Sequence, residues 1–262
     1  MRGVRRVAAG VAIAMAVGAC GTTDEIEYEE RPVDALYNEA MDALEAGEAV
    51  TAAELFDEVE RQHPYSPWAT RAQVLSAYSY YEGNQYDEAI AALDRYIRLH
   101  PANPDVSYAH YLKGTAFYER ITDVERDQSM TLDARKAFEQ LVTRYPASPY
   151  ARDARLKLDL INDHLAGKEM SVGRFYLRQG HQLAAINRFR RVVEDFQTTT
   201  HVPEALHRLT EAYTVLGLDD EARRMAAILG YNYPDSDWYI DAYELVENRS
   251  VRVREEPWYK FW

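Results

Sequence analysis

Histidines and paired carboxylates are the residues of this chain whose chemistry could support catalysis or metal binding. The 262 residues include seven histidines and 43 aspartates and glutamates. His201 and His207 are six residues apart, a spacing that directs two side chains of a helix to different faces and not to one metal ion. Acidic pairs such as Asp219–Asp220 are better explained by chance and by solvated helix faces than by acid–base catalysis. None of the motifs HExxH, GxSxG, GxxxxGKS/T and GxGxxG occurs. The sequence therefore predicts neither an enzyme nor a cofactor or metal site.

The single cysteine, Cys20, indicates a different chemistry, the attachment of lipid. One cysteine excludes a disulfide framework and a thiolate-rich metal site. Three arginines precede an apolar run over residues 7–17, which is too short to cross a bilayer and is typical of a signal peptide. The run ends in the letters VGAC (17–20), which resemble the bacterial lipobox, whose cysteine is acylated and becomes the mature N-terminus. We predict a lipoprotein signal peptide over 1–19; the alternative is an ordinary signal peptide with an incidental cysteine.

The residues after Cys20 predict where the protein is anchored. Gly21 follows the cysteine, where lipoproteins retained in the inner membrane often carry Asp, so the resemblance favours the outer membrane and a protein that faces the periplasm. Residues 20–32 are polar and acidic and form a predicted tether. The net charge is −13, and loss of the three signal-peptide arginines would make it −16. Such a charge disfavours nucleic acid and anionic lipid as partners, so acyl chains on Cys20 must provide the attachment to outer-membrane lipid.

Downstream of the tether, one pattern of residues recurs five times. A small residue is followed by apolar residues four and seven positions later and by a proline twelve positions later. The small residues are Ala52, Ala89, Ala134, Ala185 and Ala222. Two units depart from the pattern, with Ala226 in the bulky position and Gln197 in place of the proline.

This pattern predicts two helices joined by a turn in each unit. Glycine ends the first helix because it adopts the left-handed conformation; Gly47, Gly180 and Gly217 stand five residues before their alanines, and Gly83 stands six before Ala89. The alanine allows close approach, the apolar set forms the buried stripe, and proline stops the second helix. The pattern and its spacing are typical of tetratricopeptide repeats. We predict an all-α, right-handed solenoid of about five such helix pairs, with repeats 1–3 over 33–149 and a long connecting helix with repeats 4–5 over 150–249.

Two irregularities make the pattern specific. A polar insert between Tyr118 and Leu132 carries the motif DxxRDQ (123–128), and an unusually long helical pattern covers 150–176. Together with the lipobox and the five units, these segments resemble the BamD family, the lipoprotein subunit of the machine that assembles β-barrel proteins into the bacterial outer membrane. HPYSPWATRAQ (63–73) and DARLKLDLINDHLAGKE (153–169) are also similar to segments of that family. The resemblance covers roughly residues 20–247.

The resemblance implies two binding surfaces. The family is thought to receive unfolded outer-membrane barrel proteins with its N-terminal repeats, and the aromatic residues there suggest Tyr78, Tyr81, Tyr108 and Tyr111 as the substrate-peptide groove; core packing is the alternative role for some of them. In the family, an arginine after Asn on the second helix of the fourth unit contacts the periplasmic repeats of BamA. That match assigns the BamA contact to a cluster of three arginines, Arg188, Arg190 and Arg191, with Arg188 in the matching position. Other assembly-complex lipoproteins are implied as further partners.

Other readings differ in class. A different tetratricopeptide lipoprotein of the outer membrane, such as a pilotin or a peptidoglycan-synthesis coordinator, would lack the insert and the long connecting helix.

The tail over 250–262 ends in Trp258, Tyr259, Phe261 and Trp262 and is not part of the family pattern. Such an apolar cluster should not stay exposed. We expect the tail to dock on a partner subunit, and folding back onto the last repeat is the alternative.

Overall fold

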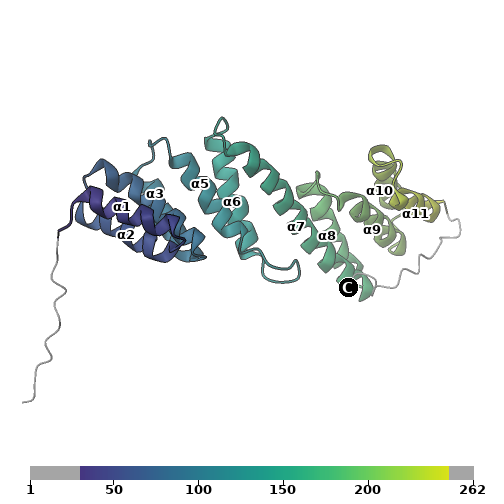
Figure 1. Cartoon of the computed structure of the whole chain (residues 1–262). Helices are drawn as coiled ribbons and strands as arrows, with labels where there is room; N and C mark the ends of the chain where they lie inside the picture. Colours follow the sequence, from purple (N-terminus) through teal and green to yellow (C-terminus); the bar gives the residue numbers. More distant parts are fainter. Residues whose placement is uncertain (1–29, 248–262) are drawn as a thin grey trace, which may run out of the picture.

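The computed structural model describes residues 30–247, and these residues form an elongated row of helices that follow one another in chain order (Figure 1). The eleven helices of the described part are α1 (Val33–Glu45), α2 (Ala49–Gln62), α3 (Pro67–Glu82), α4 (Tyr86–Leu99), α5 (Val106–Tyr118), α6 (Ser129–Arg144), α7 (Ala151–Arg178), α8 (Gln182–Asp195), α9 (Val202–Val215), α10 (Asp219–Asn232) and α11 (Asp237–Val246). Each helix packs on its neighbours in the chain, and α11 covers α9 and α10. The described part is thus five helix pairs and a closing helix, which confirms the predicted all-α solenoid.

The recurring apolar pattern forms the buried stripe of the second helix in every pair. The five alanines that open the pattern, Ala52, Ala89, Ala134, Ala185 and Ala222, are all buried. The side chains four and seven positions later are buried too, as Phe189 and Val192 illustrate in α8. Because these positions lie on one face of a helix, each second helix presents one continuous apolar surface to the first helix of its own pair and to the next pair.

The turns inside the pairs correct one prediction. Gly47, Gly180 and Gly217 adopt positive φ angles of 80°, 76° and 70°, as expected for residues that end a helix in the left-handed conformation. Gly83 does not, because its φ is −78°, and Asn84 takes the left-handed position with φ 58°. Asn84 is the residue that stands five positions before Ala89. The turn geometry therefore follows the spacing to the buried alanine, and asparagine tolerates it better than most residues.

The second helices also end alike, with or without proline. The residue after the helix has φ between −125° and −136° in α2, α4, α6, α8 and α10. In four of these turns a proline follows and favours an extended residue before it. In the fourth unit Gln197 replaces the proline, and Phe196 keeps the same conformation while its ring is buried in the core. The same helix end therefore forms in this unit without a proline.

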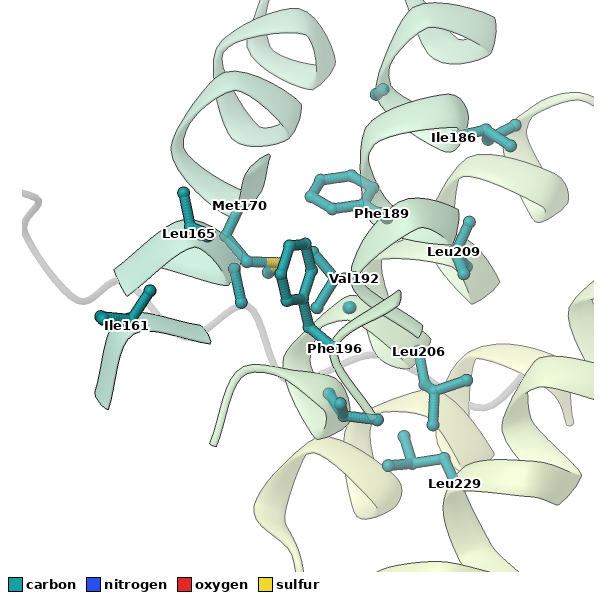
Figure 2. Packing of buried hydrophobic residues seen from close by; sticks show 14 of the residues in the cluster. Ile161, Leu165, Met170, Ile186, Phe189, Val192, Phe196, Leu206, Leu209 and Leu229 are labelled. Carbon is teal, nitrogen blue, oxygen red and sulfur yellow. The ribbon is translucent and has the colours of Figure 1, made fainter. Parts of the chain in front are cut away.

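Three clusters of buried residues run along the solenoid. The first joins α1 to α3, and the second joins α3 to α5. The third extends from Ala134 in α6 to Ala242 in α11. At its centre Met170 of α7 lies beside the ring of Phe196, the residue after α8, and near Phe189 of α8 (Figure 2). The 28-residue helix α7 is the long connecting helix that the sequence predicts, and it packs on α6 of the third pair and on α8.

In two pairs, a glycine of the first helix leaves space for a phenylalanine ring of the second helix. A Cβ atom added at Gly173 in α7 would lie 2.5 Å from the ring of Phe189, and one at Gly114 in α5 would lie 2.6 Å from the ring of Phe138. Where the pattern has Leu93 instead of phenylalanine, the small residue sixteen positions earlier is the buried Ala77. In the third and fourth pairs, the absence of a side chain at the glycine therefore makes room for the phenylalanine ring.

Gly173→Val is expected to lower the free energy of unfolding by about 2 kcal/mol or more, because the added methyl groups overlap the Phe189 ring. Thermal melting followed by circular dichroism measures the change. Ser171→Val, on the same helix, is the control and should cost much less. Adding Phe189→Leu to Gly173→Val should recover part of the loss. An unchanged melting temperature for Gly173→Val would contradict this account of the contact.

His110 in α5 makes folding sensitive to mild acid. The ring is 3% exposed, and neither ring nitrogen has a hydrogen-bond partner among residues 30–247. Burial lowers the pKa of His110, and the neighbouring charges of Arg144 and Lys113 lower it further. The folded state therefore holds the ring neutral while the unfolded chain binds a proton near pH 6.5, so stability falls as pH drops through 6.5 toward the folded pKa. Denaturant titrations at pH 7.5 and 5.5 should show a smaller decline for His110→Phe; equal declines would exclude this role.

Candidate binding surfaces

The four tyrosines predicted to line a substrate groove lie close together on α3 and α5. Tyr78 and Tyr81 come from the last turns of α3, and Tyr108 and Tyr111 come from α5, which contacts α3. All four are partly buried. The neighbouring Tyr80 points elsewhere, because its hydroxyl donates to Asp57 of α2 at 2.8 Å. The structure thus brings the four predicted residues together and assigns Tyr80 to packing between repeats.

A fifth ring, Tyr150, completes the cluster and was not predicted. Its ring centroid lies 5.3 Å from that of Tyr108 and 5.2 Å from that of Tyr111, with the second pair stacked. Tyr150 is the residue immediately before α7. Its position recurs in the sequence, because Trp68 and Trp238 also stand four residues after a repeat proline, but this recurrence does not show that Tyr150 stacks on the rings of α5. The cluster of Tyr78, Tyr81, Tyr108, Tyr111 and Tyr150 is called the tyrosine surface below.

Asp153 borders the tyrosine surface and accepts a hydrogen bond from one of its hydroxyl groups. The hydroxyl of Tyr111 donates to Oδ2 of Asp153 at 2.7 Å, and Lys157 lies 3.0 Å from the same carboxylate. Burial and this bond to Asp153 raise the pKa of Tyr111 to about 12. The bond from Tyr111, followed by that from Lys157, lowers the pKa of Asp153. Burial raises the pKa of Tyr108 as well. These rings therefore offer aromatic area and neutral hydroxyl groups at any physiological pH.

The three predicted arginines of α8 do not form one patch. Arg188 and Arg191 turn toward α7 and both donate to Glu169, at 3.0 Å to Oε2 and 2.9 Å to Oε1 respectively. Arg190 lies on another side of the helix and pairs with Glu194 at 2.9 Å, where both side chains are exposed. An exposed pair of this kind contributes little to stability. Arg188 and Arg191 therefore act together, and Arg190 stands apart from them.

A shallow hollow of about 270 Å³ opens beside the two converging arginines. Its lining consists of Tyr176, Ala184, Asn187, Arg188 and Arg191. Glu169 holds both arginines of this site, and the sequence did not predict it as a site residue. Its only signal was an acidic residue among the apolar and small residues of the segment over 165–173. The partners nineteen and twenty-two residues away become evident only when α7 and α8 pack.

The polar insert and the long helix, two separate features of the sequence, meet in the structure. The insert joins α5 to α6, and Nζ of Lys168 in α7 donates to the carbonyl oxygen of Glu125 at 2.8 Å. Within the insert, the side-chain amide of Gln128 donates to three carbonyl oxygens, including that of Arg126 at 3.1 Å. The loop is thus fixed to α7 by hydrogen bonds to its backbone.

Several predicted features lie outside the described residues. These are the signal peptide over 1–19, Cys20, most of the tether over 20–32 and the tail over 250–262. Between residues 30 and 247 no helix is both long and apolar enough to span a bilayer. The same part of the chain contains no group of three or more His, Cys, Asp and Glu side chains that could hold a metal ion.

Comparison with known proteins identifies the relatives of this chain. A family model described as "Outer membrane lipoprotein" matches residues 29–229. The outer membrane protein assembly factor BamD of Caulobacter vibrioides is 50% identical over 95% of this chain and 83% of its own length. BamD of Rickettsia prowazekii is 44% identical over 95% of this chain and 99% of its own. BamD of Neisseria meningitidis serogroup A is 31% identical over 99% of this chain and all of its own.

Solved structures similar to this chain include tetratricopeptide proteins. The tetratricopeptide domain of P58(IPK) covers 82% of this chain and 55% of its own, with a TM-score of 0.43 and 13% identity. A thermophilic tetratricopeptide protein of Thermus thermophilus covers 82% of this chain and all of its own, with a TM-score of 0.38 and 17% identity.

Proposed function

The chain belongs to the BamD family of outer membrane protein assembly factors, and from that membership we propose that it is the lipid-anchored, non-enzymatic subunit that connects unfolded barrel proteins to BamA. Family membership over this length separates it from pilotins and peptidoglycan-synthesis coordinators, the other tetratricopeptide lipoproteins that its sequence alone could suggest. In this proposal the N-terminal repeats over 33–149 bind the unfolded substrate, and the C-terminal half over 150–249 binds the other subunits of the assembly complex.

Support for substrate binding comes from the tyrosine surface. Tyrosines provide large contact areas that lose little conformational entropy, together with hydroxyl groups that form hydrogen bonds. Five such rings come from three successive helix pairs, on α3, on α5 and at the residue immediately before α7. An extended segment of an unfolded barrel protein, rich in aromatic and apolar side chains, would match this surface.

Support for BamA binding comes from the hollow beside Arg188 and Arg191. This is the observation that carries the proposal, because two partly exposed guanidinium groups converge at one place on a chain of net charge −13. Guanidinium groups form bidentate bonds to carboxylates and tolerate partial burial. The periplasmic repeats of BamA are therefore expected to present an acidic side chain to this hollow.

Purification of the tagged full-length chain from detergent-solubilised outer membrane tests the proposed function. A barrel protein with periplasmic repeats and further lipoproteins should co-purify in amounts comparable to the bait. An unrelated lipoprotein of the same membrane, tagged and purified in the same way, is the control. Recovery of the bait without any barrel protein would reject the proposal.

Deletion of the tail over 250–262 should weaken recovery of the complex while leaving melting temperature and helix content nearly unchanged. The tail carries four aromatic residues, and the last described helix already presents Ile240 and Tyr243 at its surface, 53% and 44% exposed. A large drop in melting temperature on deletion would instead assign the tail to the end of the solenoid. A substitution of Trp258 and Trp262 by serine tests the aromatic groups without shortening the chain.

A further inference from the structure

The turn between α9 and α10 exposes three apolar side chains. Val215, Leu216 and Leu218 are 68%, 39% and 45% exposed, and they flank the left-handed Gly217. The equivalent turns of the first, second and fourth pairs have no large apolar side chain at these positions. Their letters are EAGE (45–48), EGNQ (82–85) and RQGH (178–181), where this turn has VLGL (215–218). Exposed apolar side chains that gather at one place, unlike scattered ones, indicate a contact surface.

The fold of the turn does not require these side chains. The backbone N–H of Leu218 donates to the carbonyl oxygen of Tyr213 at 2.9 Å, and the backbone N–H of His181 donates to that of Tyr176 at 2.9 Å in the fourth pair. The first and second pairs form the same bond. Because residues without large apolar side chains form the same turn elsewhere in this chain, the apolar side chains here indicate a contact beyond the turn itself.

Helix α11 leads the chain back to this turn. It packs along α9 and α10 at one end of the row of helices (Figure 1). The ring of Trp238, at the start of α11, lies 5.3 Å from that of His207 in the first half of α9. Val246 follows Trp238 by eight residues and still packs on the core, and Val215 follows His207 by eight residues. Since every helical residue rises by the same length, Val246 lies about level with Val215. The chain therefore leaves α11 at the edge of the solenoid that carries the turn.

The segment that follows α11 matches the turn and its surroundings. Neighbouring helices pack about 8–10 Å apart, and an extended chain covers about 3.3 Å per residue, so the residues between Glu247 and Trp258 can reach the turn. The tail over 250–262 contains four aromatic residues, which suit the apolar side chains of the turn. It carries three basic and two acidic residues, whereas residues 219–247 carry eight acidic and two basic ones. The tail is thus complementary to this end of the solenoid in both apolar character and charge.

We propose that, in the chain without its partner subunits, the tail over 250–262 folds back onto the turn between α9 and α10 and covers Val215, Leu216 and Leu218 with its aromatic side chains. This contact is independent of the proposed function, because it needs only the free chain. The family model ends at residue 229, so α11 and the tail both lie beyond the part that it matches.

The proposed contact agrees with the results expected for deletion of the tail. A segment that covers an exposed turn adds nothing to the buried core, so its removal should change the melting temperature little. A partner subunit that binds the tail would displace it from the turn, because the same aromatic side chains cannot make both contacts. Folding back is therefore the state of the free chain, and binding to a partner replaces it.

Cross-linking between two introduced cysteines tests the contact. Val215→Cys and Lys260→Cys are combined in the full chain with Cys20→Ala, so that no other thiol is present. A short bismaleimide should then join the two cysteines rapidly within one chain, which keeps the mass of a monomer. In the control, Arg178→Cys replaces Val215→Cys at the equivalent position of the fourth pair and should react with Lys260→Cys much more slowly.

Substitutions in the double-cysteine chain separate docking from mere proximity. Leu216→Ser with Leu218→Ser should lower the rate of cross-linking about tenfold, because it removes most of the apolar area that the tail covers. Trp258→Ser with Trp262→Ser should lower the rate as well, and it changes no residue of the described solenoid. Ile240→Ser with Tyr243→Ser, two exposed residues of α11, is the matched control and should leave the rate nearly unchanged. Melting temperatures confirm that each variant is folded.

Four results would overturn the proposal. Equal rates at positions 215 and 178 would mean that the tail has no preferred place, and an unchanged rate after the leucine and tryptophan substitutions would mean that it does not bind through apolar contacts. A product with twice the mass of the chain would place the tail on a second copy. Absence of any cross-link would leave the turn uncovered in the free chain and open to a partner subunit. None of these results bears on co-purification with a barrel protein, so the proposed function is tested separately.

Discussion

Arg188→Gln is expected to weaken binding of the BamA periplasmic repeats by about 30-fold or more while the helix content and melting temperature stay nearly unchanged. Loss of one partner of an interfacial charge pair costs about 2–5 kcal/mol, and 1.4 kcal/mol corresponds to tenfold in affinity. The fold tolerates the change because Arg191 continues to donate to Glu169 from the same helix. Isothermal titration calorimetry with the purified repeats measures the affinity.

The choice of glutamine follows from the structure. The sequence alone would suggest the charge reversal Arg188→Glu. In the structure the Arg188 guanidinium lies 3.0 Å from the buried Glu169 carboxylate, so this reversal would place a second carboxylate beside Glu169. Loss of binding could then reflect repulsion between α7 and α8 within the chain. Glutamine removes the charge and leaves a hydrogen-bonding side chain.

Two controls define what the Arg188 result means. Lys136→Gln removes one positive charge from the exposed surface of α6 and should have much less effect. Arg190→Gln removes one from α8, on the side away from the hollow, and tests whether general positive charge on this helix is sufficient. Affinity of Arg188→Gln equal to that of the wild type would leave Arg188 as a structural partner of Glu169.

The helix pairs were predictable because they are determined by short-range pattern. The spacing from Ala185 to Phe189 and Val192 marks one helix face, and the left-handed residue stands at a fixed distance before it. Gly83 was wrongly predicted to take the left-handed conformation because the prediction relied on residue type. The distance to the buried alanine determines which residue is left-handed, and Asn84 stands at the position equivalent to Gly47. A repeat is made by contacts within about forty residues, so its rules are visible in a single sequence.

The candidate sites were predictable only in part, because their contacts join residues of different helices that lie far apart in the sequence. Arg188 was identified from a family match, but its partner Glu169 belongs to the preceding helix and looks like any acidic residue of a helix. Tyr150 joins the tyrosine surface through the packing of α7 on the third pair. The sequence can mark the position of such a side chain within a repeat, but the three-dimensional arrangement is needed to show which side chain of another helix it contacts.

Cys20→Ala is expected to move nearly all of the protein from the outer-membrane pellet to the soluble periplasmic fraction, or to leave an uncleaved precursor. Acyl chains contribute about 0.8 kcal/mol for each buried CH₂ group, so two or more chains hold a protein firmly, whereas their loss leaves no comparable attraction. A mature net charge of −16 opposes adsorption to anionic lipid. Between residues 30 and 247 no helix offers a second way to cross the bilayer.

Contacts with partner subunits can retain an unacylated chain, so the measurement must remove them. Fractionation is therefore done after a high-salt wash and in the Arg188→Gln background, in which binding to BamA should be weakened. Thr22→Ala, two residues beyond the cysteine, is the matched control and should stay in the membrane pellet. Folding of the released protein is checked by its helix content, because the solenoid begins at Val33, well beyond the anchor. If Cys20→Ala remains wholly in the washed membrane without its partners, lipid on Cys20 is not what attaches the protein, and the assignment of the lipobox at 17–20 fails with it.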